Sequence, residues 1–538
     1  MDASEKGCPV KTGSLYTMPI VFLFTATSYL DGLVKSQDWD GKVSVRWIGY
    51  RQLAYSLQST VYSLNKRMQC NAADGLFTKP SRINVRETVT VILAAGKGTR
   101  MKSNLVKVLH PLMGEPMLSF PIEVARKINS QDIILVTGYQ AELIRERFKG
   151  EGLTFVEQKE QLGTGHAVLC TKDTLKDFKG DILILCGDVP LIKEDTVRAL
   201  IEVHQEGSSA VTVLTTKLPN PEGYGRIIRG DDGGILRIVE ERDATDLEKE
   251  VKEVNTGIYC AKASYLFQAL QMVGRENKQS EYYLTDIVAI ATEHDEKVKG
   301  FLAEDPFEVM GINNREELAK ANEVIRREIL YKLMMNGVGI IAPQTTFIER
   351  DVRIGIDTVI YPNCYIQGNS QIGKECIIEP GSMITNSIIG DSVIIKTCCV
   401  ISDSKIANRV IIGPFAHLRP DTELEDKVKI GNFVEIKKTK IGEGSKASHL
   451  SYLGDATLGR GVNVGAGTIT CNYDGLKKNQ TIIEDNVFIG SDTQFVAPVK
   501  IGEGAYIGAG STITEDVPSG SLALSRAKQV TKKRKREL

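Results

Sequence analysis

The C-terminal third of the chain repeats an aliphatic-glycine dipeptide at intervals close to six residues. Twelve such pairs follow Gly337. Six of the eleven spacings between them are 6, 12 or 18 residues, and the other five miss a multiple of six by one. A hexapeptide period is typical of turns built from three short strands, with the aliphatic residue inward and the glycine near a corner. The sequence therefore predicts a parallel β-helix over about 337–526. The aliphatic members are Ile354, Ile372, Ile389, Ile412, Ile430, Ile441, Leu453, Leu458, Val464, Ile489, Ile501 and Ile507.

The segment before the repeats has a different pattern of apolar and polar residues. Between Thr88 and Asn336, short apolar runs such as 133–137 and 182–186 alternate with amphipathic stretches such as 196–204. This alternation predicts βαβ units and a mostly parallel sheet with helices on both faces. Residues 315–336 are rich in Glu, Ala, Leu, Lys and Arg and predict a long final helix. The expected domains are an extension over 1–86, an α/β domain over 87–314, a linker helix over 315–336, the β-helix over 337–526 and a basic tail over 527–538.

Charge and composition exclude several classes of protein. Lys and Arg number 67 against 68 Asp and Glu, so no global charge attracts nucleic acid or an anionic membrane. Ten cysteines without a C-x-x-C pair indicate reduced thiols rather than a disulfide framework or a zinc module. The apolar stretch 19–26 is too short to span a bilayer. We expect a cytoplasmic chain without nucleic-acid partners or membrane insertion.

The two ends of the chain carry no site that we can argue. Residues 1–86 lack sustained periodicity, and Asp31, Asp38 and Asp40 argue against a transit peptide. We expect a non-catalytic extension, disordered or upstream of the true start, and an accessory domain or targeting segment stays open as an alternative. The basic run 532–536 is expected to be a solvated terminus rather than a nucleic-acid contact.

The first apolar run leads into a glycine-rich turn, Leu93-Ala-Ala-Gly-Lys-Gly-Thr-Arg100, with Lys107 seven residues later. A strand that opens into such a turn presents backbone N–H groups to oxyanions. Neither the Walker order nor G-x-G-x-x-G is present. Two cations after the glycines suit a triphosphate whose charge must be neutralised during attack at phosphorus. The alternative is an ordinary βα turn with a surface arginine.

Further polar stretches support the nucleotide interpretation. A second glycine-rich loop contains Gln158, Gly163 and Thr164. The side-chain amide of Gln158 suits hydrogen bonds to the edge of a base. Asp188 ends an apolar strand, where parallel sheets bind ligands, and Asn313 supplies a second hard oxygen for Mg²⁺. Three further stretches, around Gly225, Glu240 and Asn255, carry polar groups suited to sugar hydroxyls.

Polar residues cluster unexpectedly inside the repeats, between about 414 and 478. A neutral imidazole at His449 suits removal of a proton from an ammonium group that attacks a thioester. Neighbouring cations suit a sugar phosphate. The alternative is a corner histidine bonded to backbone, and we expect such structural roles for the remaining histidines. These are His110, His166, His204, His294 and His417.

In this order, the stretches resemble the nucleoside-triphosphate:sugar-1-phosphate transferases. With the hexapeptide repeats, the resemblance narrows to the bacterial bifunctional family of N-acetylglucosamine-1-phosphate uridylyltransferase and glucosamine-1-phosphate N-acetyltransferase, over about 86–528. It implies an α/β Rossmann-like nucleotidyltransferase domain followed by a left-handed parallel β-helix. It also implies Mg²⁺, the substrates UTP and acetyl-CoA, a homotrimer with acetyl sites shared between subunits, and UDP-N-acetylglucosamine for the cell envelope.

The resemblance also implies roles for individual residues. Arg100, Lys107 and His449 would be catalytic, and Asp188 and Asn313 would hold the metal. The UTP and UDP-sugar site would contain Leu93, Ala94, Ala95, Gly96, Lys107, Gln158, Gly163, Thr164, Gly225, Glu240, Asn255 and Asn313, with Thr285 nearby. Glucosamine phosphate would contact Arg419, Lys437, Tyr452, Asn463 and Lys478, and acetyl-CoA would contact Ala466, Asn472, Tyr473, Ser491, Ala509 and Arg526.

One alternative and two departures accompany this resemblance. The alternative is a monofunctional sugar-1-phosphate uridylyltransferase whose β-helix is only a trimerising or regulatory module. Val106 stands where the family usually has proline, which predicts a less rigid loop with its charge intact. Arg242 stands where lysine is expected, which keeps the charge but changes its geometry.

Overall fold

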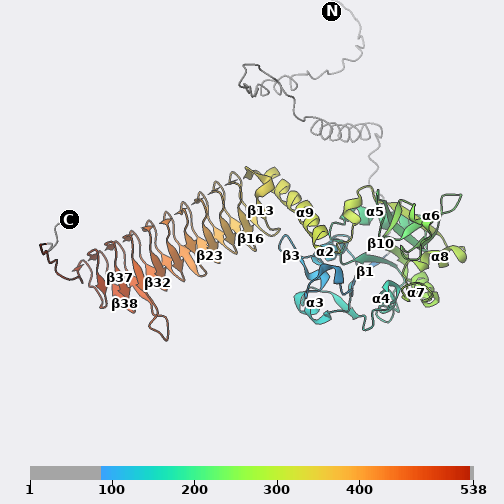
Figure 1. The fold of residues 1–538 in the computed structure, drawn as a ribbon, viewed down its shortest axis with the longest axis horizontal. Coiled ribbons are helices and arrows are strands. Elements are labelled where there is room, and N and C mark those ends of the chain that lie inside the picture. Colours follow the sequence, from blue (N-terminus) through green and yellow to red (C-terminus); the bar gives the residue numbers. More distant parts are fainter. Residues whose placement is uncertain (1–86, 534–538) are drawn as a thin grey trace, which may run out of the picture. The chain divides into compact units, whose positions relative to one another are not determined.

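The computed structural model describes residues 87–533. The predictions for the extension 1–86 and for residues 534–538 of the basic tail lie outside the described residues. In Figure 1 the α/β part is coloured from blue to green and the strand repeats from yellow to red. Within the described residues, no helix is both long enough and apolar enough to cross a bilayer.

A mostly parallel sheet forms the α/β part, as predicted. Its strands follow the order β11-β7-β10-β6-β1-β4-β5, in which only β10 runs antiparallel to its neighbours among the described strands of this path. The strands β8 and β9 pair with each other beside β10, and β2 and β3 form a separate hairpin. The bounds are β1 Thr88–Ala94, β2 Pro111–Leu112, β3 Glu115–Pro116, β4 Ile133–Thr137, β5 Thr154–Glu157, β6 Asp181–Cys186, β7 Val211–Lys217, β8 Arg226–Arg229, β9 Ile235–Val239, β10 Glu253–Lys262 and β11 Val298–Leu302.

Helices cover both faces of this sheet. Side chains alternate along a strand, so Val91 packs into a core with α4, α7 and α8, while Ile92 packs into the opposite core with α2, α3 and α5. The bounds are α2 Ser119–Lys127, α3 Ala141–Arg147, α4 Thr164–Leu169, α5 Glu194–Gly207, α6 Asp246–Lys249, α7 Ala263–Met272 and α8 Asp286–Glu293, with short 3₁₀ turns at Thr99–Met101, Lys107–Leu109, Pro306–Val309 and Pro343–Thr345. The double cover leaves the carboxyl edge of the parallel strands open for a site.

The long helix predicted after the sheet is α9, Arg315–Met335. The Asn314 side chain caps its start by accepting a hydrogen bond from the Glu317 amide at 2.9 Å. Its buried side chains include Ile325 and Leu330, and Leu330 belongs to the core of the repeats that follow.

Three parallel faces, one strand of each per turn, make up the repeats. Eleven of the twelve aliphatic residues of the dipeptides are buried, and Ile354 is half-buried against the same core. The first face contains β12 Gly339–Ile340, β15 Val359–Ile360, β18 Ile377–Ile378, β21 Ile394–Ile395, β24 Ile411–Ile412, β27 Lys429–Asn432, β30 Lys446–His449, β33 Asn463–Val464, β36 Phe488–Ile489, β39 Tyr506–Ile507 and β41 Leu522–Ala523. The predicted inward direction of the aliphatic residues is confirmed.

The other two faces follow the first around each turn. The second contains β13 Phe347–Ile348, β16 Tyr365–Gln367, β19 Met383–Thr385, β22 Val400–Ser402, β25 His417–Leu418, β28 Glu435–Lys437, β31 Tyr452–Gly454, β34 Ile469–Cys471, β37 Gln494–Val496 and β40 Thr512–Ile513. The third contains β14 Arg353–Ile354, β17 Gln371–Ile372, β20 Ile388–Ile389, β23 Ser404–Ile406, β26 Thr422–Leu424, β29 Lys440–Ile441, β32 Ala456–Leu458, β35 Thr481–Ile483 and β38 Val499–Ile501.

One turn carries an insertion. Leu458 pairs with Ile483, 25 residues later, whereas Ile441 pairs with Leu458 after 17. The extra residues form a loop between β34 and β35 that is closed by an antiparallel bridge between Tyr473 and Lys478. This loop projects from the repeats beside β32 (Figure 1). It carries three of the residues singled out in the sequence, Asn472, Tyr473 and Lys478.

Candidate functional site

A pocket of about 310 Å³ opens at the carboxyl ends of β1, β5 and β6. Nine of the predicted nucleotide and metal residues line it, although they come from four separate segments of the chain. They are Leu93, Ala94, Ala95, Gly96, Lys107, Gln158, Gly163, Thr164 and Asp188. Their convergence follows from parallel strands, whose carboxyl ends meet at one edge of the sheet.

Two cations and two side-chain oxygens meet beside this pocket. The Lys107 ammonium donates to Asp188 Oδ2 and, at 3.2 Å, to Asn313 Oδ1. Arg100 donates to the same Asn313 oxygen at 2.7 Å. The side chains of Lys107 and Asp188 are 13% and 24% exposed, so their attraction is only partly screened by water. The two oxygens thus converge on a cation.

Glycines allow close packing in the two glycine-rich loops, which contain Gly98 and Gly163. Gly98 has φ +64°, and a Cβ there would lie 2.5 Å from the Cβ of Lys107. Gly163 has φ +112°, and a Cβ there would lie 2.5 Å from the Tyr282 carbonyl oxygen. Larger residues would therefore displace both loops. The buried Gln158 amide, predicted to read a base, donates to the Gly163 carbonyl at 3.0 Å and so holds the second loop.

The predicted sugar-binding residues form a second group. A Cβ at Gly225 would lie 3.6 Å from both Asn255 Cβ and Glu240 Oε2, and Thr285 donates to Glu240 Oε1 at 3.2 Å. Burial raises the pKa of Glu240, although the bond from Thr285 opposes this. Beyond Asn255, the Cys186 thiol, which lines the nucleotide pocket, donates to the Gly257 carbonyl at 3.3 Å.

In the repeats, His449 and four of the predicted acetyl-CoA residues follow one corner, whereas Asn472 and Tyr473 lie in the inserted loop. His449 ends β30, directly opposite Asn432 at the end of β27. Successive turns continue this corner through backbone hydrogen bonds. The Asp492 N–H donates to the Ala466 carbonyl at 2.6 Å, and the Gly510 N–H donates to the Ser491 carbonyl at 2.8 Å. Arg526 closes the series by donating to the Ala509 carbonyl at 2.9 Å. The structure therefore aligns His449, Ala466, Ser491, Ala509 and Arg526.

The predicted sugar-phosphate cations gather at the next corner. Lys478, from the inserted loop, lowers the pKa of the half-buried Lys437, and Arg419 adds to the effect. Arg419 itself is paired with Glu435 at 2.8 Å. Such repulsion between neighbouring cations favours an anion that binds them together.

Asn472 lies beside this group of cations and contacts a predicted sugar-phosphate residue. Its amide donates to Asp455 Oδ2 at 2.6 Å and to the Tyr452 hydroxyl at 3.4 Å. Tyr473 instead bonds within the inserted loop, to the Gly475 carbonyl at 2.7 Å. Asn463 lies on the first face, opposite Lys446 and Phe488, away from the cations of the second corner.

Several residues in these sites escaped sequence reasoning. Gln161 and Cys186 line the nucleotide pocket and lie inside the stretches that drew attention, whereas Glu281 lies in none of them. Burial and the Asp188 charge raise the pKa of the Cys186 thiol, so this thiol lines the pocket in its neutral form. Asn432 could have been found from the period, because it precedes His449 by one turn.

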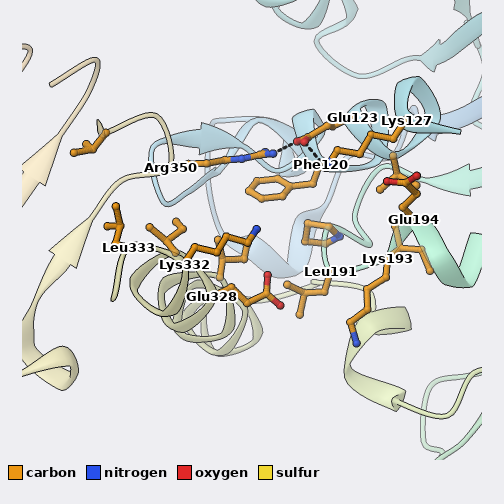
Figure 2. A pocket seen from close by; sticks show the side chains of 16 residues that line it. Phe120, Glu123, Lys127, Leu191, Lys193, Glu194, Glu328, Lys332, Leu333 and Arg350 are labelled. Atoms are coloured by element: carbon orange, nitrogen blue, oxygen red, sulfur yellow. Dashed lines mark hydrogen bonds and ion pairs between the residues drawn. The ribbon is translucent and has the colours of Figure 1, made fainter. Parts of the chain in front are cut away.

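A separate cavity of about 420 Å³ lies among α2, α9 and the chain around Arg350. Figure 2 shows Arg350 extended toward Glu123, with which it forms an ion pair, while its guanidinium lies 5.1 Å from the Phe120 ring centre. Lys127 also pairs with Glu123, at 2.7 Å. None of the predicted site residues lines this cavity.

Comparisons with known proteins find matches in both the α/β part and the repeats. Residues 89–307 match the nucleotidyl transferase family, residues 480–515 match the bacterial transferase hexapeptide family of six repeats, and residues 347–441 match the GMPPB C-terminal domain. The bifunctional protein GlmU of Pelobacter propionicus is 52% identical over 449 residues, which cover 83% of this chain and 98% of the relative. The chain belongs to the GlmU family of bifunctional proteins.

Other GlmU proteins are equally similar. That of Geotalea uraniireducens is 54% identical over 82% of this chain and 97% of its own length, and that of Geobacter metallireducens is 52% identical over 83% and 98%. The fold is thus a Rossmann-like nucleotidyltransferase followed by a left-handed β-helix. The chain is an N-acetylglucosamine-1-phosphate uridylyltransferase and a glucosamine-1-phosphate N-acetyltransferase, and the monofunctional alternative is set aside.

Proposed function

We propose that the pocket at the carboxyl ends of β1 and β6 is the uridylyltransferase site, within a domain that spans 87–314. A phosphate oxygen of N-acetylglucosamine-1-phosphate forms a bond to the α-phosphorus of UTP, and the bond from that phosphorus to the pyrophosphate oxygen breaks. Arg100 and Lys107 neutralise the negative charge that this reaction concentrates. The observation that carries the proposal is the meeting of both cations with Asn313, and of Lys107 with Asp188, at the mouth of the pocket.

Asp188 and Asn313 fit a magnesium ion. Both present hard oxygens, and these oxygens already converge on a cation, the Lys107 ammonium. Magnesium in phosphate-transfer sites takes one or two protein oxygens and completes its shell with water and substrate phosphates. When bound, the ion supplies neutralising charge for the triphosphate.

The sugar would lie where Gly225, Glu240 and Asn255 come together. The absence of a side chain at Gly225 leaves space beside the Glu240 carboxyl group, and Thr285 fixes one oxygen of that carboxyl group. A carboxyl group and an amide suit sugar hydroxyls, which both donate and accept hydrogen bonds.

For acetyl transfer, within the β-helix domain over 337–526, His449 takes the proton from the amine of glucosamine-1-phosphate as that amine attacks the thioester carbonyl. The bond from the carbonyl carbon to sulfur then breaks, and coenzyme A leaves with its sulfur as the thiol. Asn432 Oδ1 lies 3.0 Å from His449 Nδ1 and accepts its N–H, which leaves Nε2 to accept the proton. Arg419, Lys437 and Lys478 hold the phosphate, with Tyr452 and Asn463 on the sugar. Acetyl-CoA lies along Ala466, Ser491, Ala509 and Arg526, with Asn472 and Tyr473 near its acetyl group.

A trimer would complete this second site. The His449 corner follows the first face of the β-helix and the cation corner follows the second, so one chain presents the two groups at different corners. Exposed apolar residues accompany the first corner, where the Phe415 and Phe433 rings stack at 5.5 Å beside Leu450. Such a stripe is suited to cover by another copy of the chain.

A product assay tests both sites at once. Wild-type protein and His449→Ala are incubated with acetyl-CoA, glucosamine-1-phosphate, UTP and Mg²⁺, and products are followed by mass. We expect wild type to form UDP-N-acetylglucosamine, the cytoplasmic precursor of cell-envelope polymers, and the variant to form it only from N-acetylglucosamine-1-phosphate. Wild-type dependence on the acetylated sugar would contradict the proposed acetyl site.

A further inference from the structure

The loop that carries Lys107 is held by a side chain that the proposed chemistry does not use. The Gln140 amide oxygen accepts the Val106 backbone N–H at 2.8 Å, and the Gln140 amide nitrogen donates to the Asn104 carbonyl at 2.8 Å. One carboxamide thus bonds the backbone on both sides of Leu105. This arrangement holds the segment immediately before Lys107.

Gln140 is itself well anchored. It follows β4, which pairs with β1, and it immediately precedes α3. Its backbone has φ +54°, and its carbonyl accepts from the Leu143 amide at 3.1 Å. The side chain therefore extends from the short turn that joins β4 to α3.

Gly98 confines Lys107 as well. The backbone at Gly98 is so close that a Cβ there would lie 2.5 Å from Lys107 Cβ. Val106, which donates its backbone N–H to Gln140, is fully buried and immediately precedes Lys107 in the chain. A shift of the 104–106 backbone would therefore move the lysine relative to Asp188 and Asn313.

We propose that Gln140 is a positioning residue for uridylyl transfer, which fixes the Lys107 ammonium in the pocket through its two bonds to the 104–106 backbone. This inference rests on the proposed role of Lys107. It also accounts for Val106, because a proline there has no N–H and would leave the Gln140 oxygen without this donor. In this chain a hydrogen bond supplies the restraint that a proline ring would supply.

The proposal predicts graded losses of uridylyl transfer in a series of Gln140 variants. Gln140→Met keeps the volume but loses both bonds, and Gln140→Glu keeps only the acceptor for Val106. We expect kcat for uridylyl transfer to fall about 10- to 100-fold in Gln140→Met and less in Gln140→Glu, with a smaller change in KM for UTP, since displacement of about 1 Å costs up to 100-fold. Gln131→Ala, two residues before β4, is the control and should behave as wild type.

A double-variant cycle separates positioning from general loss of structure. Val106 has φ −55° and ψ 140°, which proline adopts. In a Val106→Pro background, Gln140→Met should cost at most a third of its effect in wild type, because the ring replaces the restraint. Acetyl transfer by the same preparations reports folding and should stay within twofold of wild type. If Val106→Pro fails to fold, the graded series alone decides.

The outcomes distinguish this inference from the function on which it rests. Lys107→Ala should abolish most uridylyl transfer, and if it does not, the proposed role of Lys107 is wrong. If Lys107→Ala is inactive while Gln140→Met matches Gln131→Ala, the proposed role of Gln140 alone is overturned. Equal losses of uridylyl and acetyl transfer in Gln140→Met would also overturn it, since they indicate a structural role.

Discussion

His449 and Asn432 occupy the same position on consecutive turns of the β-helix, and His449 Nδ1 lies 3.0 Å from Asn432 Oδ1. Because an amide oxygen only accepts, this contact selects the tautomer with the proton on Nδ1. The other ring nitrogen is then the acceptor. Asn432, one turn of the β-helix before His449, thereby orients this candidate catalytic base.

Removal of Asn432 should therefore impair acetyl transfer without removing the histidine. We expect Asn432→Ala to lower kcat for acetyl transfer about 10-fold, because the wrong tautomer becomes populated, whereas His449→Ala should lower it about 10²- to 10⁴-fold. Release of free CoA thiol measures both rates. Uridylyl transfer by the same samples should be unchanged, and a loss in Asn432→Ala as large as that in His449→Ala would argue against a purely orienting role.

Removal of one cation from the second corner should weaken sugar-phosphate binding. Lys478→Gln deletes a proposed phosphate partner and the main cause of the lowered pKa of Lys437. We expect KM for glucosamine-1-phosphate to rise about tenfold, which corresponds to the roughly 1.5 kcal/mol of one hydrogen bond to a charged group. Steady-state kinetics at two salt concentrations measure it. Lys477→Gln, next to it in the loop, is the control, and equal effects of both variants would contradict a specific contact.

Steric contact at Gly98 offers a test of the Lys107 position. Gly98→Ala should lower uridylyl transfer at least tenfold, because the new Cβ displaces Lys107. Gly152→Ala is the matched control, since Gly152 has a similar φ of +71° but no atom within 4 Å of the position that a Cβ would take. Both variants carry comparable backbone strain, so equal activities would show that the contact with Lys107 is unimportant.

Stability should depend on pH through Asp286, whose pKa is raised to about 6 by burial and by the Asp243 charge. The folded state holds this proton more tightly than the unfolded state, so its contribution is complete below pH 4 and is lost as pH rises through 6. Asp286→Asn should therefore melt about 2 °C higher than wild type at pH 8, with the difference shrinking below pH 6.

Thermal melts at several pH values measure the Asp286 effect. Asp231→Asn, an exposed aspartate between β8 and β9, is the control and should show no such pH-dependent difference. A lower melting temperature for Asp286→Asn at pH 8 would mean that the charged carboxylate contributes favourable contacts.

The oligomer proposal makes its own prediction. Phe433→Glu places a charge on the exposed stripe beside the His449 corner and should convert the proposed trimer into smaller species, with a loss of acetyl transfer. Light scattering measures the mass. Uridylyl transfer, whose residues lie together in one chain, should persist. If Phe433→Glu keeps the mass of the wild-type oligomer and full acetyl transfer, the stripe is not part of the interface.

The sequence alone was sufficient for features with a local physical cause. The hexapeptide period predicted the buried aliphatic columns, because each turn repeats the same inward position. The turn after Leu93 and the carboxylate at Asp188 were each placed at the end of an apolar strand, where parallel sheets bind ligands. Both predictions depend only on strand direction and side-chain alternation.

Contacts between distant segments were decided only by the tertiary structure. Gln140 reaches Val106 from across the sheet edge, and nothing in the sequence near either residue indicates this bond. Lys478 approaches Lys437 because an inserted loop returns to a neighbouring turn, and Asn432 faces His449 because the turn between them is 17 residues long. Such pairs depend on register and loop closure, which are set by the packing of the whole fold.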